Sequence, residues 1–565
     1  MRRAVVAIVA GLLLAGCASV PTSGPVQRHN PQAPAASTGV QVAPLPPAAD
    51  ATQLLVVEGF LHAMSVYQDG YPVARQYLTD EAAKSWHPEA GVQVYADGYP
   101  PMETDQTVVL SATLVGQIDS TGVYQPAAGT LRIDFNLQKN ADGQWRINRP
   151  PDGILVSRYL FSTGFDAVDV HYLATSGDVL VPEPRYFPVG DASLRQAAAA
   201  VLAGASAWLA PVVRKPVGDA IRLESVTLDE DGVARVALDG SPSQVSADQQ
   251  QALLAELTYT LSGFSQVVGV EVFSGAQRWL DRDGRTAFTR STFSQLNPAG
   301  SGSPRLLYQA REGKLSRQRD SSDWSDFTEV ASALPKVEGL AVNARQDAWA
   351  AVTGDGTQLV SGGMDSERSK QVRGGAGLLA PIYSRSGELW SLDSSGVSGL
   401  RVYRDGAEVK VTLAAVPKGR VVAASLSPDG VGLALVVASG GSSRLGLVRV
   451  LRTEAKVTVG GWHEIDLTSV GATGSQLLGL GWNTATELAV LRNDGTSQTS
   501  VALVSQDGAT LTDIGPSDST SLRSVLAAAG RPALALSTGG ALYRFSGEFD
   551  WEVVSAGVEA AAYPG

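Results

Sequence analysis

The chain has 565 residues, of which 44% are hydrophobic and 18% charged, and its formal net charge is −12 at pH 7. This composition is typical of about three globular domains and differs from that of a disordered chain. The acidic balance argues against a nucleic-acid partner, because phosphate binding requires clustered Lys and Arg. It also argues against broad electrostatic adhesion to anionic lipid.

The chain begins with a short leader that ends at Cys17, the only cysteine. Arg2 and Arg3 precede an apolar run over residues 4–14, which matches a secretory signal and is too short to span a bilayer. The sequence Leu-Ala-Gly-Cys at its end resembles a bacterial lipobox, in which the cysteine receives diacylglycerol and, after cleavage, an acyl chain. We therefore predict a signal peptide over residues 1–16 and lipidation of Cys17. The alternative is a stray buried cysteine behind an ordinary signal peptide.

Residues 17–49 form a tether in this interpretation, because Pro, Ser, Gln, Thr and Ala dominate the segment after the cysteine. In an extended polyproline conformation such a segment rises about 3.1 Å per residue. The tether then acts as a spacer that lifts the folded body off the bilayer. The alternative is an unstructured segment with no selected length.

We predict a small α+β domain over residues 50–162. Asp50 and Gln53 are spaced like a capping box, and the apolar positions that follow lie on one helical face: Leu54, Val57, Leu61 and Met64. A second helical stretch over 73–86 divides near Thr79. Strands are then predicted over 107–115, 129–138 and 144–148, with residues 140–143 as a hairpin turn. Helices followed by a strand meander favour helices packed on one face of a sheet.

Residues 163–292 carry a more specific pattern. Strands are predicted over 168–173, 178–185, 223–228, 232–238 and 267–273. One helix face ends at Gly204, and Ser246 with Gln249 forms a capping box before a second helix that stops near Gly263. This order, with the phrases LVPEPR, GVARVALDG and LTYTLSGFSQVVGVEVFSG, resembles the GerMN module of bacterial envelope and sporulation proteins. The resemblance implies an α+β interaction domain without catalysis.

Residues 303–565 repeat loosely. Segments with two short apolar strands around a polar turn occur at 340–352, 382–392, 424–436, 480–491 and 525–536. Corresponding turn entries are 41 to 56 residues apart, and a period near 40 to 50 residues with several strands per unit is typical of a β-propeller. The phrase SLSPDGVGLALV around Ser427 looks like the blade motif of TolB-like propellers. Further strands at 306–315 and 541–554 predict about six blades, with five or seven as alternatives, and a ring closed between its first and last strands.

Short turns are predicted throughout the propeller. Hairpin turns are expected at Asp355-Gly356, Asp405-Gly406, Asp494-Gly495 and Asp507-Gly508. The large aromatic residues are expected to pack in cores or between blades, with a glycan- or protein-binding surface as the alternative: Trp208, Trp324, Trp462 and Trp551.

A search for catalytic or metal-binding residues finds no motif. The histidines are scattered without metal-ligand spacing: His29, His62, His87, His171 and His463. The GxSxG elbow and the P-loop are absent from the sequence. The acidic segments 229–232 and 281–284 lack the terminal Glu of a twelve-residue calcium loop, so they are interpreted as turns. We predict no catalytic residues, no cofactor and no metal site.

The order of the modules resembles the actinobacterial lipoprotein LpqB family from end to end. This resemblance implies a protein on the extracytoplasmic face of the cell membrane, anchored by N-terminal acyl and diacylglycerol groups. It also implies binding to the extracellular domain of the MtrB sensor histidine kinase. Through that kinase the protein would modulate the MtrA response regulator, cell-wall homeostasis and division. Only Cys17 maps onto a defined functional position of the family.

Two classes of function remain open at this point. In the first, the protein binds a membrane protein, and confinement of both partners to one membrane plane raises their effective concentration. In the second, the protein binds or cleaves cell-wall glycan with carboxylates gathered around a propeller channel. Fold alone does not separate the two. The absence of a local catalytic motif favours binding, and we predict that the protein is not an enzyme.

Overall fold

A computed structural model describes residues 43–565 except positions 105–106, 191, 216, 219–220, 301–305, 320–322, 332–333, 365, 367, 471–473, 494, 496–497 and 517–519. The predicted lipidation site Cys17, the signal peptide and His29 lie outside the described residues. None of the helices in the described part of the chain is long and apolar enough to cross a membrane.

The N-terminal domain begins with helices α2 (Gln53–Ser65), α3 (Pro72–Arg75) and α4 (Asp80–Ser85), followed by the 3-10 turn η1 (Pro88–Ala90). The Thr52 side chain accepts a hydrogen bond from the Leu55 N–H at 3.3 Å and caps α2. The predicted cap at Asp50 is therefore wrong, because Thr52 directly precedes the first helical residue and its hydroxyl reaches the free N–H groups. Thr79 caps α4, so the predicted division of the second helical stretch is confirmed.

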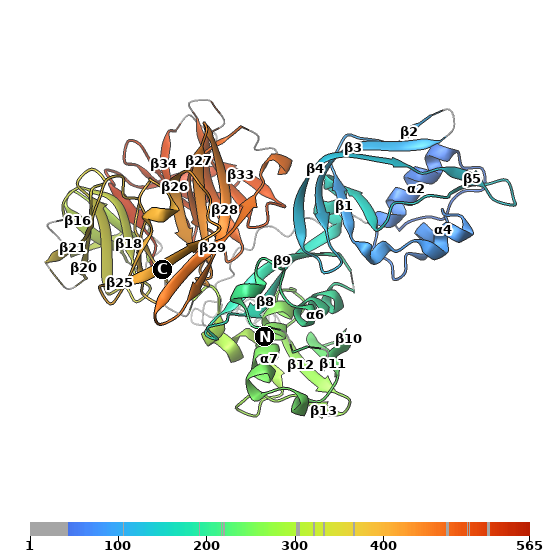
Figure 1. Ribbon diagram of the computed structural model, residues 1–565, viewed down its shortest axis with the longest axis horizontal. Coiled ribbons are helices and arrows are strands. Elements are labelled where there is room, and N and C mark those ends of the chain that lie inside the picture. The colour runs from blue at the N-terminus through green and yellow to red at the C-terminus, as the bar shows by residue number, and fades with distance from the viewer. Residues whose placement is uncertain are drawn as a thin grey trace, which may run out of the picture. The chain divides into compact units, whose positions relative to one another are not determined.

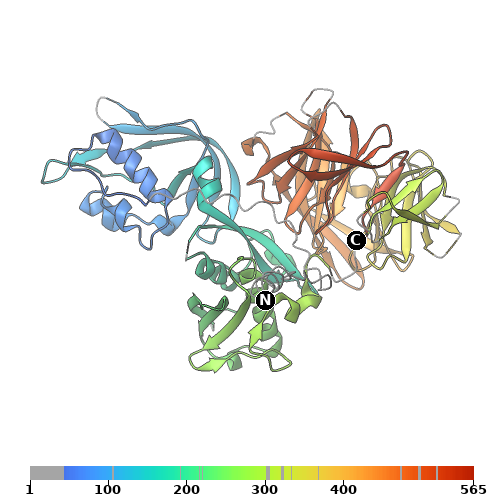
Figure 2. The same ribbon diagram turned by 180° about the vertical axis from the view of Figure 1, so that it is seen from behind.

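One sheet supports these helices. Its strands are β1 (Val92–Tyr95), β2 (Met102–Glu103), β3 (Val108–Ile118), β4 (Tyr124–Asp134) and β7 (Ile154–Ser157). β1 pairs antiparallel with β3 and parallel with β7, so the sheet is mixed and the predicted simple meander is wrong. Helix α2 lies along this sheet (Figures 1 and 2) and buries Val57, Phe60 and Met64 against it.

A small hairpin and a helix complete the N-terminal domain: β5 (Leu137–Lys139), β6 (Trp145–Ile147) and α5 (Arg158–Gly164). The predicted strand over 129–138 is divided in the structure, because Asn136 adopts a left-handed conformation with φ 44° that ends regular pairing. The turn predicted over 140–143 is confirmed, with Lys139 opposite Trp145.

The central domain follows the predicted order. Its elements are β8 (Phe165–Leu173), β9 (Leu180–Pro188), α6 (Ser193–Ala203), η2 (Ala210–Val212), β10 (Arg222–Leu228), β11 (Val233–Asp239), η3 (Pro242–Gln244), α7 (Ala247–Leu261), β12 (Gly269–Ser274), β13 (Gln277–Arg278), β14 (Ala287–Phe288) and η4 (Arg290–Leu296). The capping box of Ser246 and Gln249 starts α7 as predicted, and Gly204 ends α6. Both helices pack with β8 and the β10–β12 sheet around one apolar core.

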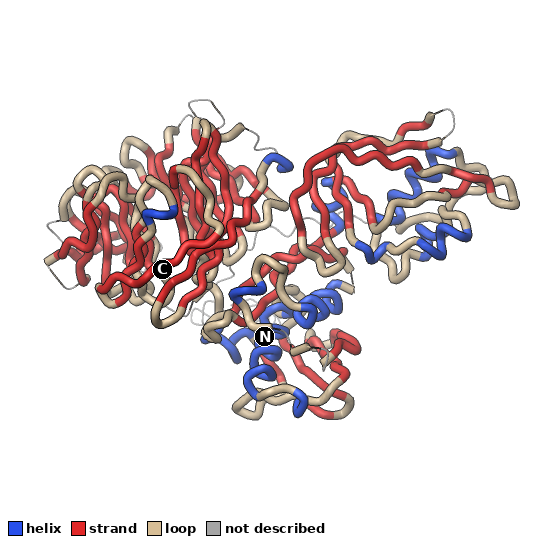
Figure 3. The backbone as a smooth tube through the Cα atoms, in the orientation of Figure 1, coloured by secondary structure: helices blue, strands red, loops and turns tan. Residues whose placement is uncertain are grey.

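The C-terminal domain is almost entirely strand (Figure 3). Its first three blades are built from β15 (Tyr308–Arg311), β16 (Lys314–Gln318), β17 (Phe327–Ala331), β18 (Val337–Val342), β19 (Ala348–Thr353), β20 (Gln358–Gly363), β21 (Ser369–Gly374), β22 (Ile382–Tyr383), β23 (Leu389–Ser391), η5 (Val397–Gly399), β24 (Arg401–Arg404) and β25 (Ala407–Ala414). The last three use β26 (Arg420–Leu426), β27 (Gly432–Ser439), β28 (Ser442–Arg452), β29 (Lys456–Ile465), η6 (Thr468–Val470), β30 (Gln476–Trp482), β31 (Glu487–Asn493), β32 (Thr499–Ser505), β33 (Leu511–Gly515), β34 (Leu522–Leu526), β35 (Leu534–Ser537), β36 (Leu542–Gly547) and β37 (Asp550–Ser555). The final strand, β38 (Ala560–Ala562), returns to the first blade.

These strands form six blades, and the prediction of a closed ring is confirmed. The last strand, β38, pairs with β15 and completes the first blade, so Tyr308 lies opposite Ala562. Blades three and four are further joined at their outer edges, where β25 pairs parallel with β29 and the two blades form one eight-stranded sheet. Closure and this second pairing remove sheet edges that an exported all-β domain would otherwise expose.

Candidate functional site

Strand β9 belongs to the central domain and contacts both the N-terminal domain and the propeller. It pairs along its whole length with β8 and forms a two-stranded ribbon, and it carries the LVPEPR phrase recognised in the sequence. Eight of its nine residues are buried, although a two-stranded ribbon has only one paired neighbour. Leu180, Val181 and Phe187 are buried in the core of the central domain, whereas Arg185 and Tyr186 are covered by the neighbouring domains, so β9 is the place where the domains are joined.

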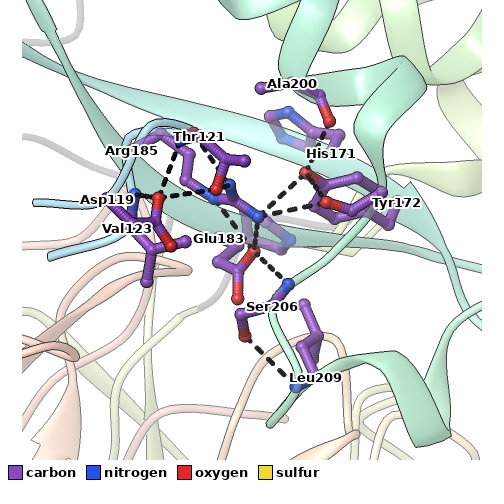
Figure 4. Close-up of polar contacts among 12 residues, drawn as sticks. Asp119, Thr121, Val123, His171, Tyr172, Glu183, Arg185, Ala200, Ser206 and Leu209 are labelled. Carbon is purple, nitrogen blue, oxygen red and sulfur yellow. Dashed lines mark hydrogen bonds and ion pairs between the residues drawn. The ribbon is translucent and has the colours of Figure 1, made fainter. Parts of the chain in front are cut away.

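Arg185 joins the central domain to the N-terminal domain (Figure 4). Its guanidinium donates from Nη1 to both the backbone oxygen and the hydroxyl of Thr121 at 2.8 Å. Nε and Nη2 bind Glu183 Oε2 at 3.1 and 2.5 Å, and Nη2 also reaches the Tyr172 hydroxyl and the Gly204 carbonyl at 3.2 Å. The arginine is fully buried, and Glu183 is nearly so.

The loop that receives Arg185 is itself held in place. One oxygen of Asp119 accepts hydrogen bonds from the Thr121 N–H, the Thr121 hydroxyl and the Val123 N–H at 2.7 to 3.1 Å (Figure 4). On the other side, Glu183 Oε2 accepts from the Ser206 N–H at 3.1 Å. All three guanidinium nitrogens of Arg185 are therefore occupied by protein acceptors. The cluster is a structural ion pair that stabilises a domain contact, with no free donor on the guanidinium for a ligand.

Tyr186, the next residue of β9, contacts both outer domains. Its ring lies 5.1 Å from the ring of Phe161 and 5.8 Å from that of Tyr124, both in the N-terminal core. Its hydroxyl donates to Asp507 of the propeller at 3.4 Å. Burial beside the Asp507 carboxylate raises the pKa of Tyr186 well above its ordinary value, so the tyrosine stays protonated and remains a donor.

Trp208 anchors the central domain on the fourth blade. Its indole N–H donates to the Gly461 carbonyl at 2.7 Å, and its ring lies 5.5 Å from the ring of His463. Arg449 donates in return to the Trp208 carbonyl at 2.8 Å. Gly461 has φ 71°, and a Cβ there would lie 2.3 Å from the Arg449 guanidinium. A side chain at this position would therefore disrupt the contact.

Three carboxylates lie in or beside the same joint. Asp169 of β8 accepts from the Thr486 hydroxyl at 3.1 Å, and Asp507 accepts from the Ser505 hydroxyl at 2.6 Å. Burial raises the pKa of Asp169, Glu487 and Asp507, and the nearby Asp507 charge contributes to the shift of Asp169. Asp507 Oδ2 is buried and has no hydrogen-bond partner among the described residues. Desolvated carboxylates make the joint costly unless its other contacts compensate.

The histidine and the acidic segments considered as candidate sites in the sequence have structural roles in the fold. His171 is buried against the Tyr259 ring at 5.5 Å, and burial lowers its pKa to about 3. The segments 229–232 and 281–284 are turns, in which Asp229 and Asp281 accept backbone N–H groups of their own loops. Within the described part of the chain, no group of three or more His, Cys, Asp and Glu side chains is placed to hold a metal ion.

The predicted packing of the tryptophans is confirmed. Trp208 lies between the central domain and the propeller, and Trp462 packs on the core of blades three and four. Trp551 donates to the Ile514 carbonyl of the neighbouring blade at 2.7 Å. Trp324 is covered by the guanidinium groups of Arg531 and Arg544, 4.9 and 5.1 Å from its ring.

Sequence reasoning missed the joint itself. The phrase LVPEPR indicates the central domain, but it does not by itself indicate the roles of Glu183 and Arg185. A usable signal was present, because a charged pair at alternate positions of an apolar strand points both side chains to one face and requires partners there. Trp208 was considered for packing, but nothing in the sequence indicates its partner Gly461.

Comparison with known proteins places these features in a family. Three protein-family models match the chain. The model described as "Lipoprotein LpqB, N-terminal domain" matches residues 46–162, the model described as "Sporulation and spore germination" matches residues 169–275, and the model described as "Lipoprotein LpqB beta-propeller domain" matches residues 313–564. The "Lipoprotein LpqB" of Cutibacterium acnes is 32% identical, with 99% of this chain and 98% of that protein covered. The chain belongs to the LpqB lipoprotein family. The LpqB protein of Streptomyces avermitilis is 28% identical, with 98% of this chain and 96% of that protein covered. The LpqB protein of Mycobacterium bovis is 26% identical, with 90% of this chain and 89% of that protein covered.

Solved structures match parts of this chain at low sequence identity. TolB from Acinetobacter baumannii has 14% sequence identity and a TM-score of 0.32, with 57% of this chain and 86% of that chain covered. A nidogen/laminin complex has 10% identity and a TM-score of 0.34, with 46% and 97% covered. Membership of the LpqB lipoprotein family, together with the three matched domains, is consistent with a lipid-anchored membrane protein.

Proposed function

We propose that this LpqB protein binds the extracellular domain of a sensor histidine kinase of the MtrB type. Through that contact it modulates two-component signalling in cell-wall homeostasis and division. In this proposal Cys17 carries the diacylglycerol and acyl groups that hold the protein on the extracytoplasmic face of the cell membrane. Membership of the LpqB family along nearly the whole chain supports the proposal.

The observation that carries the proposal is the joint at β9. Fully buried Arg185 and the Trp208 contact tie the central domain to the N-terminal domain and to the propeller. Domains held this way present one composite surface, and little conformational entropy is lost when a partner contacts more than one of them. A single binding body suits a protein that recognises a large partner.

The tether and the lipid anchor strengthen the proposed binding of the protein to the kinase. A lipid-anchored protein and a membrane-spanning kinase share one membrane plane, so the second contact forms at high effective concentration. Two or three buried acyl chains, at about 0.8 kcal/mol per CH2, keep the protein at the bilayer where one chain would be marginal. A modest affinity of the folded body therefore suffices for function.

In-cell photocrosslinking tests the proposal. A photoreactive residue is placed in turn at exposed apolar positions, Val268 in the central domain and Val553 in the propeller, of the anchored full-length protein. We expect capture of the kinase ectodomain, identified by mass spectrometry, from at least one position. The Cys17→Ser variant serves as the control, and its capture should fall because the anchor is lost. The absence of kinase from every position, together with turnover of purified wall glycan by the protein, would contradict the proposal and favour the enzyme alternative.

A further inference from the structure

The central domain contains a pocket apart from the β9 joint contacts. It has a volume of about 510 Å³, which lies within the usual range of small-molecule sites. It is lined by residues from the first turns of α7, the loop over 281–285 and η4, and by Leu173, Gly177 and Arg214 from earlier in the chain. Four separate segments of the chain, at 173–177, 214, 248–252 and 281–296, therefore build one concave site.

Apolar side chains and amide groups line the interior. Leu173, Phe293 and Leu296 form an apolar part of the lining, and Phe293 is 3% exposed. Gln251 from α7 and Gln295 from η4 provide side-chain amides that donate and accept hydrogen bonds. This combination suits a ligand that carries both aliphatic groups and amides.

Charged groups in the pocket differ in their pairing. Arg282 is paired with Asp248, and Arg285 is paired with Asp281 and Asp283 at 3.2 and 2.9 Å. The Arg282–Asp248 pair is exposed at 68% and 69%, so it is weak and can open for a ligand. Two arginines meet three aspartates here, so these paired groups together carry a net charge of −1.

Arg214 differs from Arg282 and Arg285 in that it has no ion-pair partner among the described residues. Arg214 is exposed, and its guanidinium lies beside Gly177, where a Cβ would be 2.1 Å from Nη2. Its backbone is fixed, because the Arg214 N–H donates to the Leu173 carbonyl at 2.7 Å. An exposed guanidinium on a fixed backbone, without an acidic partner in the part of the chain that the structure describes, can turn toward a ligand and bind a carboxylate in bidentate fashion.

The buried acid Glu256, which feels the charge of Arg214, does not neutralise it at neutral pH. Glu256 accepts a hydrogen bond from the Leu173 N–H at 2.8 Å and is 8% exposed. Burial raises the pKa of Glu256 to about 8, so its carboxyl group is mostly protonated at neutral pH. The positive charge of Arg214 is therefore available to an anionic ligand.

We propose that this pocket binds short peptides through their free terminal carboxylate. Arg214 holds the carboxylate, Gln251 and Gln295 pair with peptide amides, and the apolar lining receives a small aliphatic side chain. The site goes beyond the proposed kinase contact and does not depend on it. Peptides of this chemistry arise from protein breakdown, with L-residues at the end, or from cell-wall stems, with D-residues.

Isothermal titration calorimetry on the chain from Ala18 to Gly565 tests this site. The probes are acetyl-trialanine with all L-residues and acetyl-trialanine with two D-residues at its carboxyl end, each as free acid and as terminal amide. We expect at least one free acid to bind about tenfold more tightly than its amide, which corresponds to about 1.4 kcal/mol. The stereoisomer that binds identifies the source of the peptide.

Two variants locate the binding. Arg214→Ala should remove the preference for acid over amide, and Arg214→Lys should retain part of it, since an ammonium group keeps the charge but loses the bidentate geometry. Arg222→Ala, which removes an exposed arginine outside the pocket, is the matched control and should bind like the unchanged chain. Equal binding of acid and amide, absence of binding at peptide concentrations up to about 10 mM, or an unchanged preference in Arg214→Ala would each overturn the proposal.

Discussion

Replacement of Trp208 by alanine should uncouple the central domain from the propeller. The indole is partly buried between the cores of the two domains and donates one hydrogen bond, to Gly461 at 2.7 Å. Large-to-small substitutions of buried aromatic residues cost about 3 to 5 kcal/mol, and the partial exposure of Trp208 places the loss near the lower end, at about 3 kcal/mol. Arg449 keeps its bond to the backbone oxygen of residue 208, so part of the joint remains.

Hydrogen exchange measures this loss where it occurs. A loss of about 3 kcal/mol in the closed joint raises its opening equilibrium by about 100-fold, because each 1.4 kcal/mol is a factor of ten. We expect amides of β8 and of residues 461–463 to exchange correspondingly faster in Trp208→Ala, while amides of β34 and β35 keep their protection. Thermal unfolding should then separate into two transitions.

Trp551 provides a matched control. It is also a partly buried tryptophan whose indole N–H donates to a carbonyl, that of Ile514, at 2.7 Å, but both residues belong to the propeller. Trp551→Ala should destabilise the propeller and leave exchange at β8 unchanged. If Trp208→Ala and Trp551→Ala give the same exchange pattern, or if β8 stays protected in Trp208→Ala, Trp208 does not couple the domains.

Three further predictions follow from the described contacts. Arg185→Met removes one partner of a buried pair and leaves Glu183 uncompensated, so the free energy of unfolding measured with urea should fall by about 3 to 5 kcal/mol, and a loss below about 1 kcal/mol would refute the role given to the pair. The pKa of Glu256 is about 8 in the folded state and near 4.5 in the unfolded state. The contribution of Glu256 to the free energy of unfolding is therefore fully present below pH 4.5. It is lost as the pH rises toward 8, by roughly 1.4 kcal/mol per pH unit. Glu256→Gln should therefore narrow the stability difference between pH 5 and pH 8.5, and an unchanged difference would show that Glu256 is ionised in the fold. A chain that stops after Gly540 loses β38 and the outer strands of blade six, and limited proteolysis should digest its propeller; a resistant fragment would contradict closure through β15 and β38.

Local rules account for what the sequence predicted well. Ser246 with Gln249, and Gly204 at a helix end, act within a few residues of chain, so their chemistry is visible in the sequence. The error at Asp50 is of the same local kind, because Thr52 is an equally good cap placed two residues closer to the helix. The repeat spacing gave the propeller, since every blade supplies the same pattern of strands.

Contacts between distant segments could not be predicted in this way. Trp208 and Gly461 are 253 residues apart, and Tyr186 and Asp507 are 321 residues apart. The strand β1 has only four residues, and the β3–β4 and β5–β6 hairpins separate it in sequence from its parallel partner β7, so no local pattern indicated the mixed sheet. The pocket at Arg214 likewise needs the fold to bring four separate segments together.

Binding of the purified kinase ectodomain to the chain from Ala18 to Gly565 tests the central claim, that the domains joined at β9 act as one binding body. We expect saturable binding by surface plasmon resonance, and an affinity at least tenfold lower for Trp208→Ala than for Trp551→Ala. Equal affinity of the two variants, or no binding of the ectodomain by the unchanged chain, would contradict the claim.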